Sequence, residues 1–169
     1  KREWSCKRGP EVVEIRDCDN LDLLDRWRLS SSPRASVALR LGREGPPVRE
    51  RNYPNIRVFF ETDEKSPLPI LIHADFPLKE GRANVLIEDE ASGADVHEVS
   101  QAVAHLARAA LAEVHDPGFL LDLLSPRVAP EEMGRIEREL WNALKNAIAS
   151  LDIPGAGGLR LDKVRLRPT

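Results

Sequence analysis

The residues of this 169-residue chain that could do chemistry gather in its middle, and the first candidates are a histidine and an aspartate. His73 and Asp75 close an apolar run, two positions apart, so in an extended segment they would point the same way. Such a pair could exchange protons as a general acid and base. It could equally be a buried hydrogen-bonded pair that fixes the end of a strand, because buried polar groups find partners.

A second candidate is Arg82, which follows a glycine on a polar loop. Its planar, permanently charged guanidinium suits phosphate oxygens, and Lys79 stands close enough in sequence to assist. The alternative is a surface ion pair with Glu80, Glu88 or Asp89, since pairs of this kind are common on protein surfaces. The residue pattern alone leaves both interpretations open.

The remaining reactive side chains do not assemble into a recognisable site. His97 and His105 could share one face of a helix, but no carboxylate or cysteine completes a ligand set at helical spacing, so we expect no metal site. Cys6 and Cys18 fit neither a disulfide framework nor a zinc site, and we interpret them as free thiols in a reducing cytoplasm. The sequence lacks the phosphate-loop, dinucleotide-binding, zinc-protease and serine-hydrolase motifs.

Composition narrows the classes of protein to which the chain could belong. It is 41% hydrophobic and 31% charged, as expected of a globular protein with a highly charged surface. A net charge of -3 argues against a nucleic-acid binder driven by bulk charge. No apolar run is long enough for a transmembrane helix, so we expect no membrane partner and a cytoplasmic location. The chain begins at Lys1 rather than methionine, which suggests a piece of a longer protein.

The first half of the sequence predicts strands that would position these candidates. Short apolar patterns predict strands at residues 11–16, 35–41 and 55–60, and a continuous apolar run predicts a strand at 70–74 in a central position of the sheet. A capped apolar pattern predicts a short helix at 19–27, and charges with two prolines predict a loop at 61–69.

The second half of the sequence is helical in character. An amphipathic pattern predicts a helix at 95–114 with Asp95 as its cap, followed by a short helix at 119–124. Pro130 suits a first turn, a second long helix is predicted at 131–151, and a last strand at 159–166. The fold class is therefore α+β, with a mixed or mostly antiparallel sheet and packed helices. We expect a first domain at 1–125 and a helical extension at 126–169.

One stretch of this sequence, residues 56–89, resembles a known family. Its matching elements are Phe59-Phe60-Glu61-Thr62, then Leu68-Pro69-Ile70-Leu71-Ile72-His73-Ala74-Asp75-Phe76, and Arg82-Ala83-Asn84-Val85-Leu86-Ile87-Glu88-Asp89. Together they are similar to the segment that follows the nucleotide-binding domain in sacsin-like ATPases, members of the GHKL group with gyrase, the ninety-kilodalton heat-shock chaperone and histidine kinases. Glu61 stands where that family tends to have proline.

This resemblance implies a role for Arg82. In the chaperones the matching arginine crosses to the nucleotide-binding domain and contacts the γ-phosphate, so Arg82 takes a catalytic position, and Arg82 with Lys79 a cofactor-binding one. The chain itself would be a non-catalytic middle, or transducer, domain with a fold like ribosomal protein S5 domain 2. ATP and Mg²⁺ would bind to the longer protein and not to this chain alone.

The resemblance also implies partners for the chain. These are the nucleotide-binding domain of the same protein and an unknown protein client, and a homodimer is compatible with it. The alternative function is a protein–protein interaction module with no role in nucleotide hydrolysis. An enzyme that uses His73 and Asp75 is a third interpretation, which requires both side chains to be exposed in a cleft.

Overall fold

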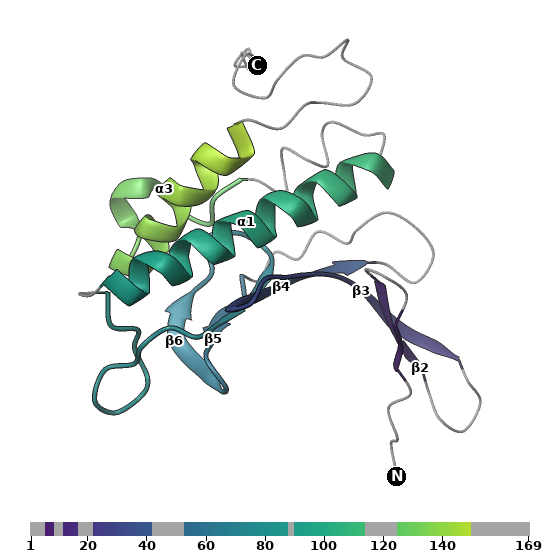
Figure 1. Cartoon of the computed structure of the whole chain (residues 1–169), viewed down its shortest axis with the longest axis horizontal. Coiled ribbons are helices and arrows are strands. Elements are labelled where there is room, and N and C mark those ends of the chain that lie inside the picture. The colour runs from purple at the N-terminus through teal and green to yellow at the C-terminus, as the bar shows by residue number, and fades with distance from the viewer. Residues whose placement is uncertain are drawn as a thin grey trace.

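The chain folds into a sheet that carries helices on one face (Figure 1). The computed structural model describes residues 6–8, 12–16, 22–41, 53–87, 90–113 and 125–149. The strands are β1 (Cys6–Arg8), β2 (Val12–Arg16), β3 (Leu23–Ser31), β4 (Ala35–Leu41), β5 (Asn55–Arg57), β6 (Glu61–Lys65) and β7 (Leu71–Ala74). The helical elements are α1 (Glu90–Glu113), the 3₁₀ turn η1 (Pro130–Glu132) and α3 (Arg135–Ala149).

The described strands lie in the order β1-β2-β3-β4-β7-β5-β6. β5 and β7 pair in parallel, and the other described pairs are antiparallel, so the sheet is mixed. β7 lies between β4 and β5, which confirms the central position predicted for the strand at 70–74. The α+β class is also confirmed. Figure 1 shows the sheet curving away from the helices at its β2–β3 end.

A single hydrophobic core joins the sheet to both helices. Alternate residues of β4 and β7 face the helices, as the two-residue period of a strand requires, and the facing stripes of α1 and α3 recur at three- and four-residue steps. The principal core residues are Val37, Leu39, Ile56, Ile72, Phe76, Val99, Val103, Leu106, Ile136, Leu140 and Leu144. The predicted division after residue 125 stays a prediction, but α3 packs into the same core as the sheet.

The helix predicted at 19–27 is wrong for the part that the structure describes. Residues from Leu23 onward form β3, a nine-residue strand, while 19–21 lie outside the described residues. Pairing on both sides decides this outcome, since Trp27 lies opposite Val13 on one neighbour and Arg40 on the other. The backbone hydrogen bonds of two ladders outweigh a local helical pattern.

The loop predicted at 61–69 is wrong in its first half, because Glu61–Lys65 forms the edge strand β6. Charged residues are the usual protection of an exposed sheet edge. Thr62 points inward and donates its hydroxyl proton to Ile56 O at 2.7 Å. The strand predicted at 55–60 is shorter than expected, because β5 ends at Arg57 and the next three residues turn into β6.

The helices begin differently from the prediction. α1 starts at Glu90, so Asp95 lies inside the helix and is not its cap, which makes that prediction wrong. Pro130 opens the separate 3₁₀ turn η1 and not the long helix predicted from residue 131, which begins only at Arg135. The predicted elements at 119–124 and 159–166 lie outside the described residues.

Candidate functional site

A short hairpin at residues 77–86, called the Arg82 loop below, presents the arginine that the sequence singled out. Its arms are joined by backbone hydrogen bonds from Lys79 N–H to Asn84 O (2.9 Å) and from Leu86 N–H to Pro77 O (2.7 Å). Leu78 and Val85 form the bridge between these bonds. The base of the loop is therefore built like a small piece of antiparallel sheet, which fixes where its tip begins and ends.

The tip of the Arg82 loop is a four-residue turn, closed by Arg82 N–H donating to Lys79 O at 2.9 Å. Gly81 occupies its third position with φ at 93°, a value that type II turns require and that glycine adopts without strain. Arg82 follows with φ at 62°, in the left-handed region. For a residue with a side chain this conformation costs about 1–2 kcal/mol, so the surrounding hydrogen bonds must impose it.

The side chain of Arg82 is exposed at this tip. It forms no ion pair with the residues that the structure describes, including Glu80, one of the three partners considered from the sequence. The other two, Glu88 and Asp89, lie outside the described residues. A fixed loop thus carries a cation at its tip.

The edge strand β6 supports the Arg82 loop from one side. Asp63 N–H donates to Ala83 O at 2.8 Å, which joins the strand to the loop one residue beyond Arg82. Burial raises the pKa of Glu64 above its usual value, while the positive charge of Lys79 acts in the opposite direction. The positive charge of Lys79 therefore acts on Glu64. The contact of Lys79 with a phosphate stays a prediction.

His73 and Asp75 are not brought together. His73 is half-buried on β7, where its ring meets the edge of Phe59 with ring centroids 6.4 Å apart and planes at 85°. Asp75 is exposed just beyond the strand, and its backbone N–H donates to Arg34 O at 3.1 Å. Because β7 ends at Ala74, the alternation that would have aligned the two side chains stops between them. The buried-pair interpretation is therefore wrong for Asp75.

The turn between β5 and β6 carries two exposed phenylalanines that sequence reasoning placed in a strand. Phe59 is 85% exposed with φ at 36°, and Phe60 is 40% exposed. The signal that marks them is the position of two aromatic residues directly before a charged edge strand. In Figure 1 the β5–β6 hairpin and the Arg82 loop both extend below the helices, on the same side of the molecule.

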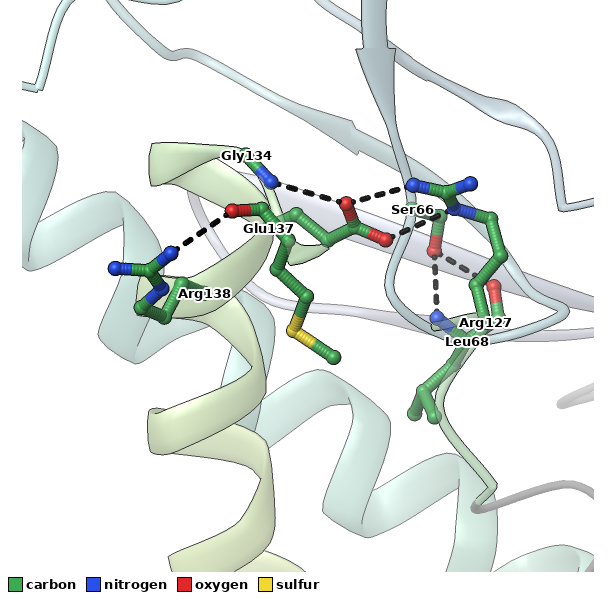
Figure 2. Close-up of polar contacts among 7 residues, drawn as sticks. Ser66, Leu68, Arg127, Gly134, Glu137 and Arg138 are labelled. Carbon is green, nitrogen blue, oxygen red and sulfur yellow. Dashed lines mark hydrogen bonds and ion pairs between the residues drawn. The ribbon is translucent and has the colours of Figure 1, made fainter. Parts of the chain in front are cut away.

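The start of α3 is fastened to the sheet by a second polar cluster (Figure 2). The guanidinium of Arg127 donates from Nε and Nη2 to the two carboxylate oxygens of Glu137, each at 3.0 Å, and Glu137 is buried. This hydrogen bond raises the pKa of Arg127. Arg127 N–H also donates to Pro67 O at 3.1 Å, so the segment before α3 is tied to the loop that follows β6.

The other candidate residues form no metal centre in the part of the chain that is described. His97 and His105 are both exposed on α1, and His105 Nδ1 lies 3.0 Å from Ser30 Oγ on β3. Cys6 lies in β1 and Cys18 outside the described residues, so their state as free thiols stays a prediction. Of the helices described, none has the length and apolar character needed to cross a membrane.

Scanned against protein-family models, curated proteins and solved structures, the chain matches none of them. A proposal for its function therefore has to start from the geometry of the Arg82 loop and from the resemblance of residues 56–89.

Proposed function

We propose that this chain is the non-catalytic middle domain of a longer sacsin-like GHKL ATPase, in which Arg82 completes the ATP site of a neighbouring nucleotide-binding domain. The observation that carries this proposal is the presentation of Arg82. Its exposed guanidinium stands at a strained tip on a hydrogen-bonded base, with no ion pair to the described residues. Donors held in place before the substrate arrives are those that stabilise a transition state best.

In this proposal the catalytic contribution of the chain is electrostatic. ATP and Mg²⁺ belong to the neighbouring domain, and phosphoryl transfer spreads negative charge over the oxygens of the γ-phosphate. The guanidinium of Arg82 donates to those oxygens, with Lys79 beside it as a second cation. The domain transmits the nucleotide state to a protein client in the cytoplasm. The mixed sheet with its helices is compatible with the proposed fold like ribosomal protein S5 domain 2.

The first test is the Arg82→Ala variant of the longer protein. We expect ATP turnover to fall at least about tenfold, equivalent to about 1.4 kcal/mol of transition-state stabilisation, with unchanged thermal unfolding. Arg57→Ala is a matched control, because Arg57 is also an exposed arginine and is ion-paired with Glu61 at 3.2 Å. Steady-state kinetics on both variants measures the effect.

Two outcomes would contradict the proposal. Unchanged ATP turnover in Arg82→Ala would show that Arg82 is an exposed surface residue without a catalytic role. Measurable ATP turnover by the 169-residue chain alone would show that the chain carries a complete site of its own.

A protein-interaction module is the second candidate, and the exposure of Phe59 and Phe60 favours it. Exposed aromatic side chains are enriched where proteins bind one another. Under this alternative Phe59→Ser abolishes binding of the partner in pull-downs from cell extract, and Arg82→Ala changes neither binding nor ATP turnover.

A further inference from the structure

The edge strand β6 pairs irregularly with its neighbour β5. Two residue pairs lie opposite each other, Asn55 with Lys65 and Arg57 with Glu61. A single residue, Ile56, separates these pairs on β5, whereas three residues separate them on β6. The additional residues of β6 form a bulge, which interrupts the ladder locally. Bulges of this kind are common at the edges of sheets and next to functional sites.

The hydroxyl group of Thr62 closes this bulge. It donates to Ile56 O at 2.7 Å, and it accepts the backbone N–H of Glu64 at 3.3 Å, as in the turns that threonine forms with the residue two positions on. Thr62 is 1% exposed and Ile56 is fully buried, so water cannot replace the hydroxyl. The shape of the bulge therefore depends on one side-chain oxygen.

In the middle of the bulge, Asp63 gives its backbone N–H to the Arg82 loop and not to β5. This N–H donates to Ala83 O at 2.8 Å, from the last strand in the described order. The backbone of Arg82 is thus held on both sides, because its own N–H donates to Lys79 O and the carbonyl of the next residue accepts from β6. The left-handed conformation of Arg82 lies between these two hydrogen bonds, which can impose it.

We propose that Thr62 is a positioning residue for Arg82, because its hydroxyl fixes the bulge from which β6 holds the Arg82 loop. The hydroxyl connects the buried backbone of β5 to the peptide that follows Arg82, through the N–H of Asp63. Thr62 is itself buried, so it acts on a nucleotide only through the place that it gives to Arg82. The consequence for ATP turnover rests on the proposed function, whereas the hold on the loop concerns this chain by itself.

The hydrogen bond between the bulge and the Arg82 loop can be measured in the unaltered 169-residue chain. Its length of 2.8 Å is that of a strong backbone bond, so NMR should detect a scalar coupling between the nitrogen of Asp63 and the carbonyl carbon of Ala83. Absence of this coupling, in a spectrum that shows the couplings of the β3–β4 ladder, would overturn the proposal without any substitution.

Hydrogen exchange on variants of Thr62 tests the role of the hydroxyl. Thr62→Val keeps the shape of the side chain and removes the hydroxyl, so exchange of the Asp63 amide should accelerate at least about tenfold more than exchange of the β4 amides. Thr62→Ser keeps a hydroxyl and should restore slow exchange. An unchanged Asp63 rate in Thr62→Val, or an acceleration that the β4 amides share equally, would overturn the proposal.

Ser100→Ala is the matched control for this experiment. Ser100 is also buried, and its hydroxyl also donates to a backbone carbonyl, His97 O at 2.7 Å, but both residues lie in α1. Loss of this hydroxyl should leave the Asp63 rate unchanged relative to β4. An acceleration at Asp63 equal to that in Thr62→Val would show that any lost buried hydroxyl loosens the loop, which would overturn the specific role of Thr62.

Turnover of the longer protein tests the positioning role itself. Thr62→Val should lower kcat several-fold with KM unchanged, Thr62→Ser should recover most of it, and the double variant with Arg82→Ala should turn over no more slowly than Arg82→Ala alone. If Arg82→Ala lowers turnover and Thr62→Val does not, the positioning proposal fails and the proposed function stands. If Arg82→Ala has no effect, the proposed function fails, and the coupling and the exchange rates alone decide whether Thr62 holds the loop.

Discussion

Among the residues that the structure describes, two with side chains adopt left-handed backbone conformations, Phe59 at φ 36° and Arg82 at φ 62°, and both stand at exposed hairpin tips. Conformations of this kind cost about 1–3 kcal/mol each and persist only where neighbouring bonds impose them. At Phe59 the hydrogen bond that imposes the conformation runs from Val58 N–H to Phe60 O at 3.0 Å. Neither side chain is buried, so packing does not offset the strain. Strain of this type gathers at sites that bind other molecules.

Replacing Phe59 with glycine should therefore stabilise the chain. Glycine adopts positive φ freely, and the relief of strain exceeds the entropy that glycine adds to the unfolded state, so we expect a gain of up to about 1 kcal/mol. Urea unfolding measures it. Phe60→Gly is the matched control, since Phe60 has no positive φ and should lose stability. Equal changes in the two variants would show that Phe59 is unstrained.

At the scale of elements, two arginine–aspartate pairs look alike but differ in burial. Arg34, in the turn between β3 and β4, places its Nε 2.7 Å from Oδ1 of Asp95 inside α1, whose side chain is 0% exposed. Arg40 on β4 lies 3.0 Å from Asp25 on β3, whose side chain is 19% exposed. The first pair fastens α1 to the sheet, whereas the second links neighbouring strands at the surface.

This difference predicts unequal costs when each arginine is removed. Arg34→Met takes a partner from a fully buried carboxylate and should lower the free energy of unfolding by about 2 kcal/mol. Arg40→Met breaks an exposed pair and should cost about 1 kcal/mol or less. The two arginine side chains are 43% and 44% exposed, so their own desolvation is matched. Denaturant unfolding of both variants provides the comparison, and equal losses would contradict the role given to burial.

The elements that could be predicted from the sequence are those that depend on local pattern and not on contacts between distant segments. β4 largely alternates, β7 belongs to a short apolar run and α1 has apolar residues at three- and four-residue steps, so the type of these elements follows from local pattern. The type of β3 and β6 does not follow from local pattern. Leu23–Ser31 is a strand because it pairs with a neighbour on each side, and the charges of Glu61–Lys65 suit the edge of the sheet. Asp95 looked like a cap because its partner, Arg34, is distant in sequence.

The candidate site shows the same limit on a smaller scale. The exposed position of Arg82 follows from a glycine and polar neighbours in a loop, which the sequence displays. The support that β6 gives to this loop has no such signal, because only the fold brings Asp63 beside Ala83. Contacts between distant segments therefore had to be observed.

At the scale of the whole molecule, the sheet and α3 share one core, and this makes a prediction about cooperativity. Leu140 on α3 is fully buried in the same cluster as Ile72 at the centre of the sheet. Leu140→Ala should cost about 3 kcal/mol, as leucine-to-alanine changes in packed cores do. If the core is one unit, the free energy of opening measured by hydrogen exchange should fall by the same amount for the amides of β4 and for those of α3.

Exchange of β4 and α3 amides, followed together, decides between one cooperative unit and a division after residue 125. Glu139→Ala is the control, since Glu139 neighbours Leu140 in sequence but is exposed. Loss of protection confined to α3 would favour a separable extension. An equal loss in β4 would mean that α3 belongs to the body that holds the Arg82 loop, so that any partner that displaces α3 also loosens the sheet beneath Arg82.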